Sequence, residues 1–600
     1  MDEKLINMTI DGQMVEVPRG TKILDACKRV GITVPTLCYL ADISSYGSCG
    51  VCVVEVENSR RLVRSCMHTV TEAMVVNTHT PRVLNARRVN MELLLANHPL
   101  LCTRCERNLN CELQSLAHQL GVRESRFPRT RAACEEVDRS SPSLIRDPNA
   151  CILCNRCVEV CESVQTVSAI AMIGRGLNTK VGTFNDGGLA ASPCTNCGQC
   201  ALVCPTGAIV EKSCEDEVFA ALADPSLTVL VQTAPAIRVG LGEAMGLGEG
   251  ALVTGQMVSA LRRLGFDRVF DTQFTADLTI MEEAHELIHR LTNNAPLPMI
   301  TSCSPGWIKF IETFYPDQVD HLSSCKSPQQ MFGAVAKTYW AKRAGIDPRT
   351  IRVVSIMPCT AKKYEAGRSE MDGAYTWWKE GMGLGEGERF ADVDWVLTTR
   401  ELARMLALIG LDFATLEGSD FDDPLGSSTG GAVIFATSGG VMEAALRTAV
   451  EALTGTVLEN VEFSDLRERT GIREAALTIG ESTVRVAVAN TLGNARILLD
   501  QIKAGESPYT FIEVMTCPDG CIGGGGQPIP STAEIRAKRI ASIWEEDRKK
   551  PIRKSHENPS VTELYETFLT APLSPLSHAL LHTSYTKGDA YRYGQINDLA

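Results

Sequence analysis

The chain has 600 residues, of which 44% are hydrophobic and 22% charged, and its formal net charge is −13 at pH 7. That length exceeds what a single hydrophobic core supports, so we expect about four domains of roughly 150 residues each. The negative charge and the lack of clustered Lys and Arg argue against nucleic acid as a partner. The first residues lack a signal-peptide pattern and no long apolar run follows, so we expect a cytoplasmic protein without membrane insertion.

Cysteine is the most informative residue type in the chain. The 23 cysteines are grouped at short spacings rather than scattered in pairs. This pattern favours metal ligation over disulfides and predicts a reducing compartment.

The first group is Cys38, Cys49, Cys52 and Cys66, which lies among short alternating stretches that predict strands. Glycines on both sides of Cys49 allow a loop to wrap closely around a cluster. A zinc site is the alternative for four cysteines. The spacing resembles the N-terminal ferredoxin domain of the large peripheral subunit of respiratory complex I, which implies a β-grasp domain holding one 2Fe–2S cluster.

The second group combines one histidine with three cysteines: His98, Cys102, Cys105 and Cys111. Zinc accepts the same ligands. The pattern resembles a domain of complex I and of hydrogenases that holds a 4Fe–4S cluster with one imidazole ligand. A neutral imidazole in place of a thiolate leaves the cluster less negative and should raise its potential.

The third group is a repeated run of four cysteines, with a proline after the last one. Its members are Cys151, Cys154, Cys157 and Cys161, then Cys194, Cys197, Cys200 and Cys204. This is the pattern of a bacterial two-cluster ferredoxin, in which the fourth cysteine of each run serves the other cluster. We therefore expect Cys204 to complete the first 4Fe–4S site and Cys161 the second, with paired zinc ribbons as the alternative. Such clusters in series predict an electron-transfer chain.

From about residue 217 the sequence alternates between apolar runs and helical stretches, which predicts an α/β domain. Three apolar segments in this half end at a cysteine, at Cys303, Cys359 and Cys517. Side chains at the carboxyl ends of strands converge on one crevice in an open α/β sheet. A glycine-rich run at 523–526 suits a close approach of backbone to an inorganic ligand, and it lacks the Lys-Ser/Thr of a phosphate loop.

The segments TSCSPGW at 301–307, MPCTAKKYE at 357–365 and EVMTCPDGCIGG at 513–524 resemble the three signatures of iron-only hydrogenases. The resemblance implies an active-site cofactor in which a 4Fe–4S cubane is linked to a diiron unit carrying carbon monoxide, cyanide and a dithiolate bridge. It assigns Cys359, Cys517 and Cys521 to the cubane, with Cys521 bridging to the diiron unit. It also places the Lys362 ammonium near a cyanide. Two soft side chains, Met357 and Met515, would form walls of the cofactor site, or equally be ordinary core.

The first signature departs from the family at Ser304, where most relatives have a second cysteine that is the fourth cubane ligand. Serine is a poor substitute because its hydroxyl is much harder to deprotonate than a thiol. Cys325 lies where a relative in the family has alanine, so we expect Cys325 to supply the missing thiolate. Ligation by Ser304 or by Cys303 are the alternatives.

Proton delivery also has candidates. Cys303 has an ordinary thiol pKa of about 8.5, close enough to neutrality for reversible proton transfer. Glu283 and Glu286 are spaced to lie on one face of a helix. The resemblance implies a relay from Cys303 through Glu286, Ser323 and Glu283 toward solvent near Arg290. Without the resemblance, these glutamates would be read as a solvated helix face.

The predicted fold is therefore multidomain, α+β and α/β, with the active site between two lobes of a large hydrogenase domain. The expected boundaries are 1–80 (two-iron ferredoxin), 81–123 (four-iron cluster with one histidine and three cysteines), 124–145 (linker), 146–213 (two-cluster ferredoxin), 214–545 (catalytic) and 546–600 (tail). The expected activity is reversible oxidation of molecular hydrogen to protons and electrons. Expected electron partners are ferredoxin and/or flavin subunits that use NAD(P). A sensory, low-turnover relative of the enzyme and a scaffold that only conducts electrons are the alternatives.

Overall fold

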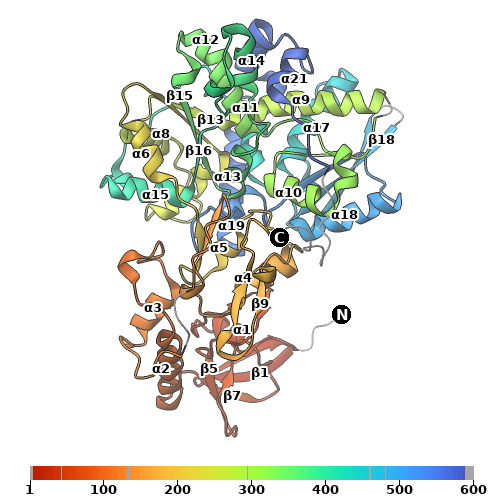
Figure 1. Cartoon of the computed structure of the whole chain (residues 1–600). Coiled ribbons are helices and arrows are strands. Elements are labelled where there is room, and N and C mark those ends of the chain that lie inside the picture. The colour runs from red at the N-terminus through yellow and green to blue at the C-terminus, as the bar shows by residue number, and fades with distance from the viewer. Residues whose placement is uncertain are drawn as a thin grey trace. The chain divides into compact units, whose positions relative to one another are not determined.

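The computed structural model describes residues 5–41, 43–130, 135–293, 295–458, 461–469, 471–479 and 482–587. Parts of the predicted linker (131–134) and of the predicted tail (588–600) lie outside the described residues. The chain divides into two compact units (Figure 1). Unit 1 comprises Met1–Val164, Ser168–Ser192 and Val203–Val210, and unit 2 comprises Gln165–Val167, Pro193–Leu202 and Glu211–Ala600.

Unit 1 begins with a five-stranded sheet in the order β2-β1-β7-β5-β6. Its strands are β1 (Leu5–Ile10), β2 (Gln13–Pro18), β5 (Val53–Val56), β6 (Val63–Arg64) and β7 (Met74–Asn77), with α1 (Ile23–Arg29) beside them. Asp11 and Gly12 both have positive φ and form the tight turn between β1 and β2, as Asp-Gly does in two-residue hairpins. Alternate residues of β1, such as Met8 and Ile10, enter the core.

The rest of unit 1 consists of short elements around cysteine loops. α2 (Pro81–Ala96) begins at the cap Thr80, whose hydroxyl accepts from the Val83 N–H, and Pro81 occupies the first helical position. The remaining elements are β3 (Tyr39–Leu40), β4 (Ser44–Ser45), α3 (Glu112–Gln119), β8 (Leu144–Arg146), α4 (Arg156–Glu159), β9 (Ala171–Ile173) and β10 (Lys180–Gly182). Two elements, α5 (Gln199–Val203) and β11 (Ile209–Glu211), cross the division between the units.

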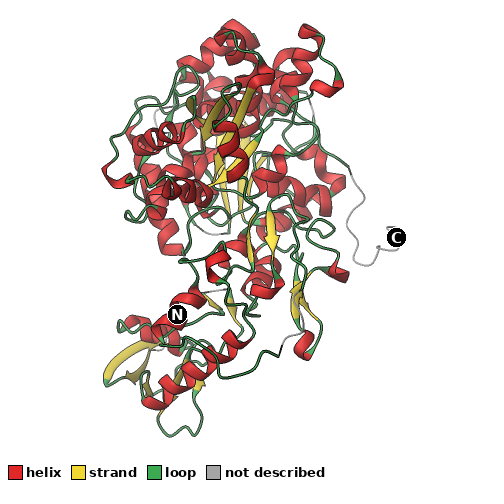
Figure 2. Ribbon diagram, turned by 60° about the vertical axis from the view of Figure 1, so that its left-hand side comes forward, coloured by secondary structure: helices red, strands yellow, loops and turns green. Residues whose placement is uncertain are grey.

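Unit 2 contains two four-stranded sheets, and its strands lie between helices (Figure 2). The first sheet is all parallel, in the order β13-β12-β15-β16. Its strands are β12 (Thr228–Thr233), β13 (Arg268–Asp271), β15 (Ile351–Met357) and β16 (Trp395–Thr398). β12 and β15 are buried along nearly their whole length, which explains their continuous apolar sequence and confirms the predicted α/β character of this region.

The second sheet has the order β14-β19-β18-β17. Its strands are β14 (Met299–Ile300), β17 (Ile472–Ile479), β18 (Ser482–Asn490) and β19 (Phe511–Met515). β14 and β18 run parallel to β19, and β17 is antiparallel to β18. The carboxyl ends of β14 and β19 therefore lie at the same edge of this sheet.

The longest helix is α9 (Thr272–Thr292), which starts at the cap Asp271 directly after β13. It is buried on most of its circumference, so several of its polar side chains lie inside the protein. A capping box formed by Thr398 and Glu401 is present at the start of α15 (Thr399–Leu408). Among the described residues, no helix has the length and apolar character needed to span a membrane.

The other helices of unit 2 connect and cover the strands. They are α6 (Glu215–Leu222), α7 (Leu241–Ala244), α8 (Thr254–Leu264), α10 (Pro305–Phe314), α11 (Pro328–Val335), α12 (Ala341–Ala344), α13 (Ala361–Ala366), α14 (Gly373–Met382), α15 (Thr399–Leu408), α16 (Gly430–Val433), α17 (Gly440–Thr454), α18 (Leu492–Ala504), α19 (Ala533–Lys549), α20 (Pro559–Leu564) and α21 (Pro575–Leu581). Helix α19 runs through the predicted boundary at 545/546, so that boundary is wrong. The residues that follow in the predicted tail include the helices α20 and α21.

Candidate active site and cluster sites

A cavity lies in unit 2 where strands of both sheets end. Cys303 follows β14, Cys359 follows β15, and Cys517 follows β19. All three line the cavity together with Cys521, which starts a short helical turn. The prediction that strand-end cysteines converge on one crevice is confirmed for these positions.

In this cavity the cysteines are difficult to ionise when no metal is bound to them. Burial, together with the charges of neighbouring thiols, raises the pKa of Cys517 well above its ordinary value. Burial likewise raises the pKa of Cys521 to about 12, and the charge of Cys359 adds to the effect. Several buried thiols that repel one another when ionised fit a site where a metal supplies the compensating positive charge.

Other predicted residues line the same cavity. Met357 and Met515 contribute apolar walls. The Lys362 ammonium also faces the cavity, where it donates to the backbone oxygen of Cys303 at 3.1 Å and to Glu365 Oε2 at 2.9 Å. A positive charge is thus held in place inside an otherwise largely apolar space.

Helix α9 carries a line of carboxyl groups away from Cys303. Burial raises the pKa of Glu283 to about 8, and the charge of Glu286 adds to the rise. Burial also raises the pKa of the Cys303 thiol well above its ordinary value, and the next largest cause is the charge of Glu283. Ser323 donates to Glu286 Oε2 at 2.8 Å, and it is also close enough to Glu283 to offset part of the rise in the pKa of that carboxyl. Arg290 Nη2 donates to Glu286 Oε1 at 2.7 Å.

This geometry reverses the predicted order of the relay residues. Glu283 is the carboxyl beside Cys303, Ser323 lies between the two glutamates, and Glu286 contacts Arg290. The reason is the direction of α9, which leads from the β13 end of the first sheet toward Arg290 near the helix C-terminus. The prediction that these residues cluster is confirmed, whereas the predicted order is wrong.

Unit 1 brings together the first group of cysteines. Cys52 Sγ lies 3.3 Å from Cys66 Sγ. Hydrogen bonds with Cys49 and Cys66 lower the pKa of Cys38 to about 2, so its thiol also belongs to this group. All four thiols are buried. Four thiols gathered this closely without a disulfide fit a metal cluster.

A second cavity lies in unit 1, and its lining includes Cys151, Cys154, Cys157 and Cys204. This is the crossed ligand set predicted from the repeated run. The other four cysteines are divided between the units, with Cys161 in unit 1 and Cys194, Cys197 and Cys200 in unit 2.

The His98 group lies close to the loop that carries Cys204. Arg107 donates to the Cys204 backbone oxygen at 3.3 Å, and the Cys111 thiol donates to Pro205 O at 3.5 Å. A Cβ built on Gly207 would lie 2.5 Å from Cys105 Sγ, so glycine is needed for this close approach. Two predicted cluster sites are therefore neighbours within unit 1.

Known protein families match nearly the whole chain. A family described as "Iron only hydrogenase large subunit, C-terminal domain" matches residues 227–525, and "Iron hydrogenase small subunit" matches 533–588. A "2Fe-2S iron-sulfur cluster binding domain" matches 3–81, the "NADH-ubiquinone oxidoreductase-G iron-sulfur binding region" matches 87–126, and a "4Fe-4S dicluster domain" matches 150–208.

Full-length relatives are also found. The chain is 50% identical to the NADP-reducing hydrogenase subunit HndD of Solidesulfovibrio fructosivorans, over 97% of this chain and 99% of that protein. The chain belongs to the iron-only hydrogenase family. This hydrogenase is 37% identical to iron hydrogenase 1 of Clostridium pasteurianum, over 96% of this chain and 99% of that protein. It also resembles the solved structure of a variant of apo FeFe-hydrogenase HydA1 from Chlamydomonas reinhardtii, at 44% identity and a TM-score of 0.55, over 62% of this chain and 98% of that one.

The protein is thus an enzyme that interconverts molecular hydrogen with protons and electrons, and its N-terminal iron–sulfur domains relay electrons. The matched families imply both 2Fe–2S and 4Fe–4S clusters and the diiron-containing active-site cofactor. The cavity in unit 2 fits that cofactor, because it brings the thiols of Cys359, Cys517 and Cys521 and one ammonium into a single mostly apolar space.

Ser304 lines the active-site cavity of the hydrogenase, whereas Cys325 is not among the cavity's residues. Cys325 is buried with its Sγ 3.7 Å from Glu286 Oε2, on the relay side. The expectation that Cys325 supplies a cubane thiolate therefore disagrees with this geometry. Cys325 follows Ser323 by two residues, and that short loop is fixed by the hydrogen bonds of Ser323 and Ser324 to Glu286.

The glycine-rich run also has a use that the sequence did not predict. A Cβ on Gly524 would lie 2.1 Å from Pro358 O, and one on Gly525 would lie 2.3 Å from Cys197 O. Both glycines admit another segment of backbone, and Gly524 also lines the active-site cavity. Gln199 also donates to Gly523 O at 2.9 Å, so the loop that carries Cys197 packs tightly against this run within unit 2.

Sequence reasoning missed several residues next to the relay. Ser324 hydrogen-bonds to His582 Nδ1 at 2.8 Å, and Glu282 Oε2 lies 3.1 Å from His582 Nε2. Tyr585 donates to Ser323 O at 3.0 Å. His582 and Tyr585 lie in the segment predicted to be a tail, and the only sequence signal for them was the pair of histidines, His578 and His582, on either side of a short apolar run.

Proposed function

We propose that Cys359, Cys517 and Cys521 hold the cubane of the active-site cofactor, with Cys521 bridging to the diiron unit. Their convergence at the ends of β15 and β19 supports this assignment. When bound, the cofactor would supply the site at which molecular hydrogen is converted to two protons and two electrons, or formed from them. The protein's own share is to bind and orient this group and to move the proton.

Ser304 is the proposed fourth group at the cubane. It lines the same cavity, and its hydroxyl is paired with Thr516 Oγ1 at 2.8 Å, next to Cys517. A hydroxyl is a weaker ligand than a thiolate, so the cubane would be held less firmly at this corner.

Lys362 is proposed to hold its ammonium against the cyanide side of the cofactor. Its bond to Glu365 and to the Cys303 backbone oxygen fixes the direction of the charge. Met357 and Met515 would exclude water around the diiron unit.

The proposed proton path runs from Cys303 to Glu283, then through Ser323 to Glu286 and Arg290. Glu283 supports this path best, because a carboxyl with a pKa of about 8 can both donate and accept a proton near neutrality. Ser323 can pass a proton because its hydroxyl is both donor and acceptor between the two carboxyls.

The proposed electron path uses four clusters. One 2Fe–2S cluster would be held by Cys38, Cys49, Cys52 and Cys66. Three 4Fe–4S clusters would be held by His98 with Cys102, Cys105 and Cys111, by Cys151, Cys154, Cys157 and Cys204, and by Cys161, Cys194, Cys197 and Cys200. Within unit 1, the contact of Arg107 with Cys204 supports exchange between two of these sites. Cys197, which lines the active-site cavity, supports delivery to the cubane.

The proposed partners are flavin subunits that use NAD(P), with ferredoxin as an additional or alternative carrier. HndD, which matches this hydrogenase over nearly its full length, is named as a subunit of an NADP-reducing hydrogenase. A cytoplasmic setting fits such partners. The remaining domain boundaries, at 80, 123, 145 and 213, are proposed on the cluster spacing.

The test is anaerobic maturation of the full chain followed by an assay of hydrogen evolution from a reduced low-potential dye. We expect turnover together with infrared bands of carbon monoxide and cyanide. Bands without turnover would support the sensory alternative. Absence of both from fully iron-loaded, maturase-treated protein would refute the proposed cofactor site.

A further inference from the structure

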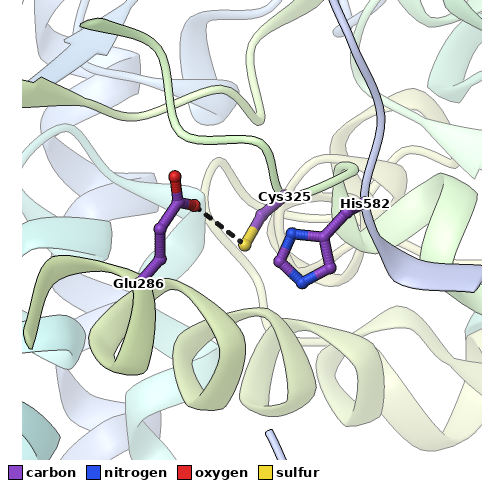
Figure 3. Close-up of side chains that lie close together, drawn as sticks. All are labelled: Glu286, Cys325 and His582. Atoms are coloured by element: carbon purple, nitrogen blue, oxygen red, sulfur yellow. Dashed lines mark hydrogen bonds between the residues drawn. The ribbon is translucent and has the colours of Figure 1, made fainter. Parts of the chain in front are cut away.

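Three different metal-ligating side chains meet beside the relay (Figure 3). Glu286 Oε2 and Cys325 Sγ are 3.7 Å apart, and a ring nitrogen of His582 is turned toward the same sulfur. The three ligand atoms lie within 4.8 Å of one another, and all three residues are buried. In a tetrahedral zinc site, bond lengths of ~2.3 Å to sulfur and ~2.0 Å to oxygen separate those two atoms by about 3.5 Å. The spacing of the glutamate and the cysteine therefore already fits such a site.

The surroundings of His582 orient it as a ligand. Glu282 Oε2 lies 3.1 Å from Nε2, so a proton on Nε2 is held by this carboxylate and Nδ1 keeps its lone pair. Glu282 is itself fixed by the Tyr565 hydroxyl at 2.6 Å and the Leu573 N–H at 2.8 Å. Ser324 Oγ is 2.8 Å from Nδ1 and can donate a hydrogen bond to it. A bound metal would replace the Ser324 hydroxyl at Nδ1. A carboxylate behind the far nitrogen is the usual support of a metal-bound histidine.

The charges around the three side chains also balance. Glu282, Glu286 and an ionised Cys325 give three negative charges, and Arg290, which bonds to the other oxygen of Glu286, gives one positive charge. A divalent cation brings the sum to zero. Its binding would replace the Cys325 thiol proton, which goes to solvent.

From this geometry we infer that Glu286, Cys325 and His582 form a binding site for Zn²⁺ or a similar divalent transition metal, and that the bound metal inhibits the enzyme. The inhibition rests on the proposed proton path, because a metal on Glu286 Oε2 would occupy the oxygen that accepts from Ser323. His578 offers a route of access from solvent, since it is exposed and its ring centroid lies 4.3 Å from that of His582.

The chain carries a matched control for this site. Glu451, His556 and Glu557 form the other such group among the described residues, but they are less buried and include no thiol. Lys554 bonds to Glu451 there, so an ammonium already neutralises one of the carboxylates. We expect this second group to bind zinc weakly.

The experiment uses the full, cluster-loaded and matured chain under anaerobic conditions. Co²⁺ serves as a spectroscopic probe of a thiolate ligand, and Zn²⁺ as the inhibitor of hydrogen evolution from a reduced dye. We expect one equivalent of Co²⁺ with a sulfur-to-cobalt absorption band, and inhibition by Zn²⁺ that a chelator reverses. His582→Ala and Cys325→Ser should each raise the half-inhibitory Zn²⁺ concentration at least tenfold, whereas His556→Ala should leave it unchanged. Each rate is compared with the same variant without metal.

Equal zinc sensitivity in all of these proteins would overturn the site, as would the absence of a cobalt–thiolate band from the wild type. His582→Ala alone decides the matter if Cys325→Ser fails to mature, because His582 lies outside the active-site cavity. In a third outcome, one equivalent of metal binds to the wild type and not to the variants, but it does not slow turnover. The metal site would then stand, whereas the inhibition and the proposed role of Glu286 in the proton path would be refuted.

Discussion

Replacement of Glu283 by Gln is the most direct test of the proton path. Glu283 is fully enclosed on α9, and burial raises its pKa to about 8. Its Oε2 has no hydrogen-bond partner among the described residues, so the amide can be accommodated without loss of a bond to that atom. An amide cannot pass a proton as a carboxyl does, and loss of such a group slows reactions by about 10²- to 10⁴-fold.

The pH dependence of the rates provides a second check on the proposed role of Glu283. With a pKa of about 8, the protonated share of Glu283 falls from about nine tenths at pH 7 to about one tenth at pH 9. Hydrogen evolution needs the protonated form, so its rate should fall roughly tenfold over this interval. Hydrogen oxidation needs the ionised form and should rise instead. Glu283→Gln should lose this inflection in both directions.

Asp277→Asn is the matched control, because Asp277 is another buried carboxyl of α9 whose pKa burial raises, to about 6. It is bonded to Thr429 and Asn558 and lies outside the proposed path. The assay is hydrogen evolution from reduced dye between pH 6 and 9, with infrared bands to confirm equal cofactor content. If Glu283→Gln keeps a rate within about threefold of Asp277→Asn, or keeps the inflection near pH 8, the proposed role of Glu283 is wrong.

Three further outcomes are expected. Cys303→Ser should keep the infrared bands but lose most activity, since a serine hydroxyl is a far weaker acid than a thiol; retention of activity would move the proton donor elsewhere. Ser304→Ala should lose cubane iron while Cys325→Ala keeps it, as iron analysis can show; the opposite result would restore Cys325 as the ligand. His98→Cys should lower the potential of one cluster in a redox titration monitored by electron resonance, because a thiolate adds negative charge; an unchanged set of potentials would remove His98 from the ligands.

Sequence spacing predicted the parts of the site that depend on local chain geometry. Cys359 and Cys517 could be placed because each follows an apolar strand, and strand ends converge in an open α/β sheet. The crossed set with Cys204 could be predicted because the two-cluster pattern fixes it. Strands such as β12 and β15 were recognisable from continuous apolar runs.

Features that depend on tertiary packing were not predictable in this way. Helical spacing places Glu283 and Glu286 on one face, but it does not say which of them is nearer to Cys303. The position of Cys325 depends on hydrogen bonds from its loop to α9, far away in sequence. His582 reaches the same place from beyond α21, and nothing in its local sequence indicates a partner such as Glu282.

The cavity draws its lining from segments that are widely spaced along the chain, from Cys197 to Gly524. A nascent chain that has emerged only as far as β15 would present Cys303 and Cys359 but would lack the strand that carries Cys517. A preformed site rarely exists before folding, so the ligand set comes into being only after the second sheet has closed around β19. Loading of the active site is therefore expected to be a late, post-translational event on an already folded protein, whereas Cys38, Cys49, Cys52 and Cys66 span a short stretch and could receive their cluster while synthesis continues.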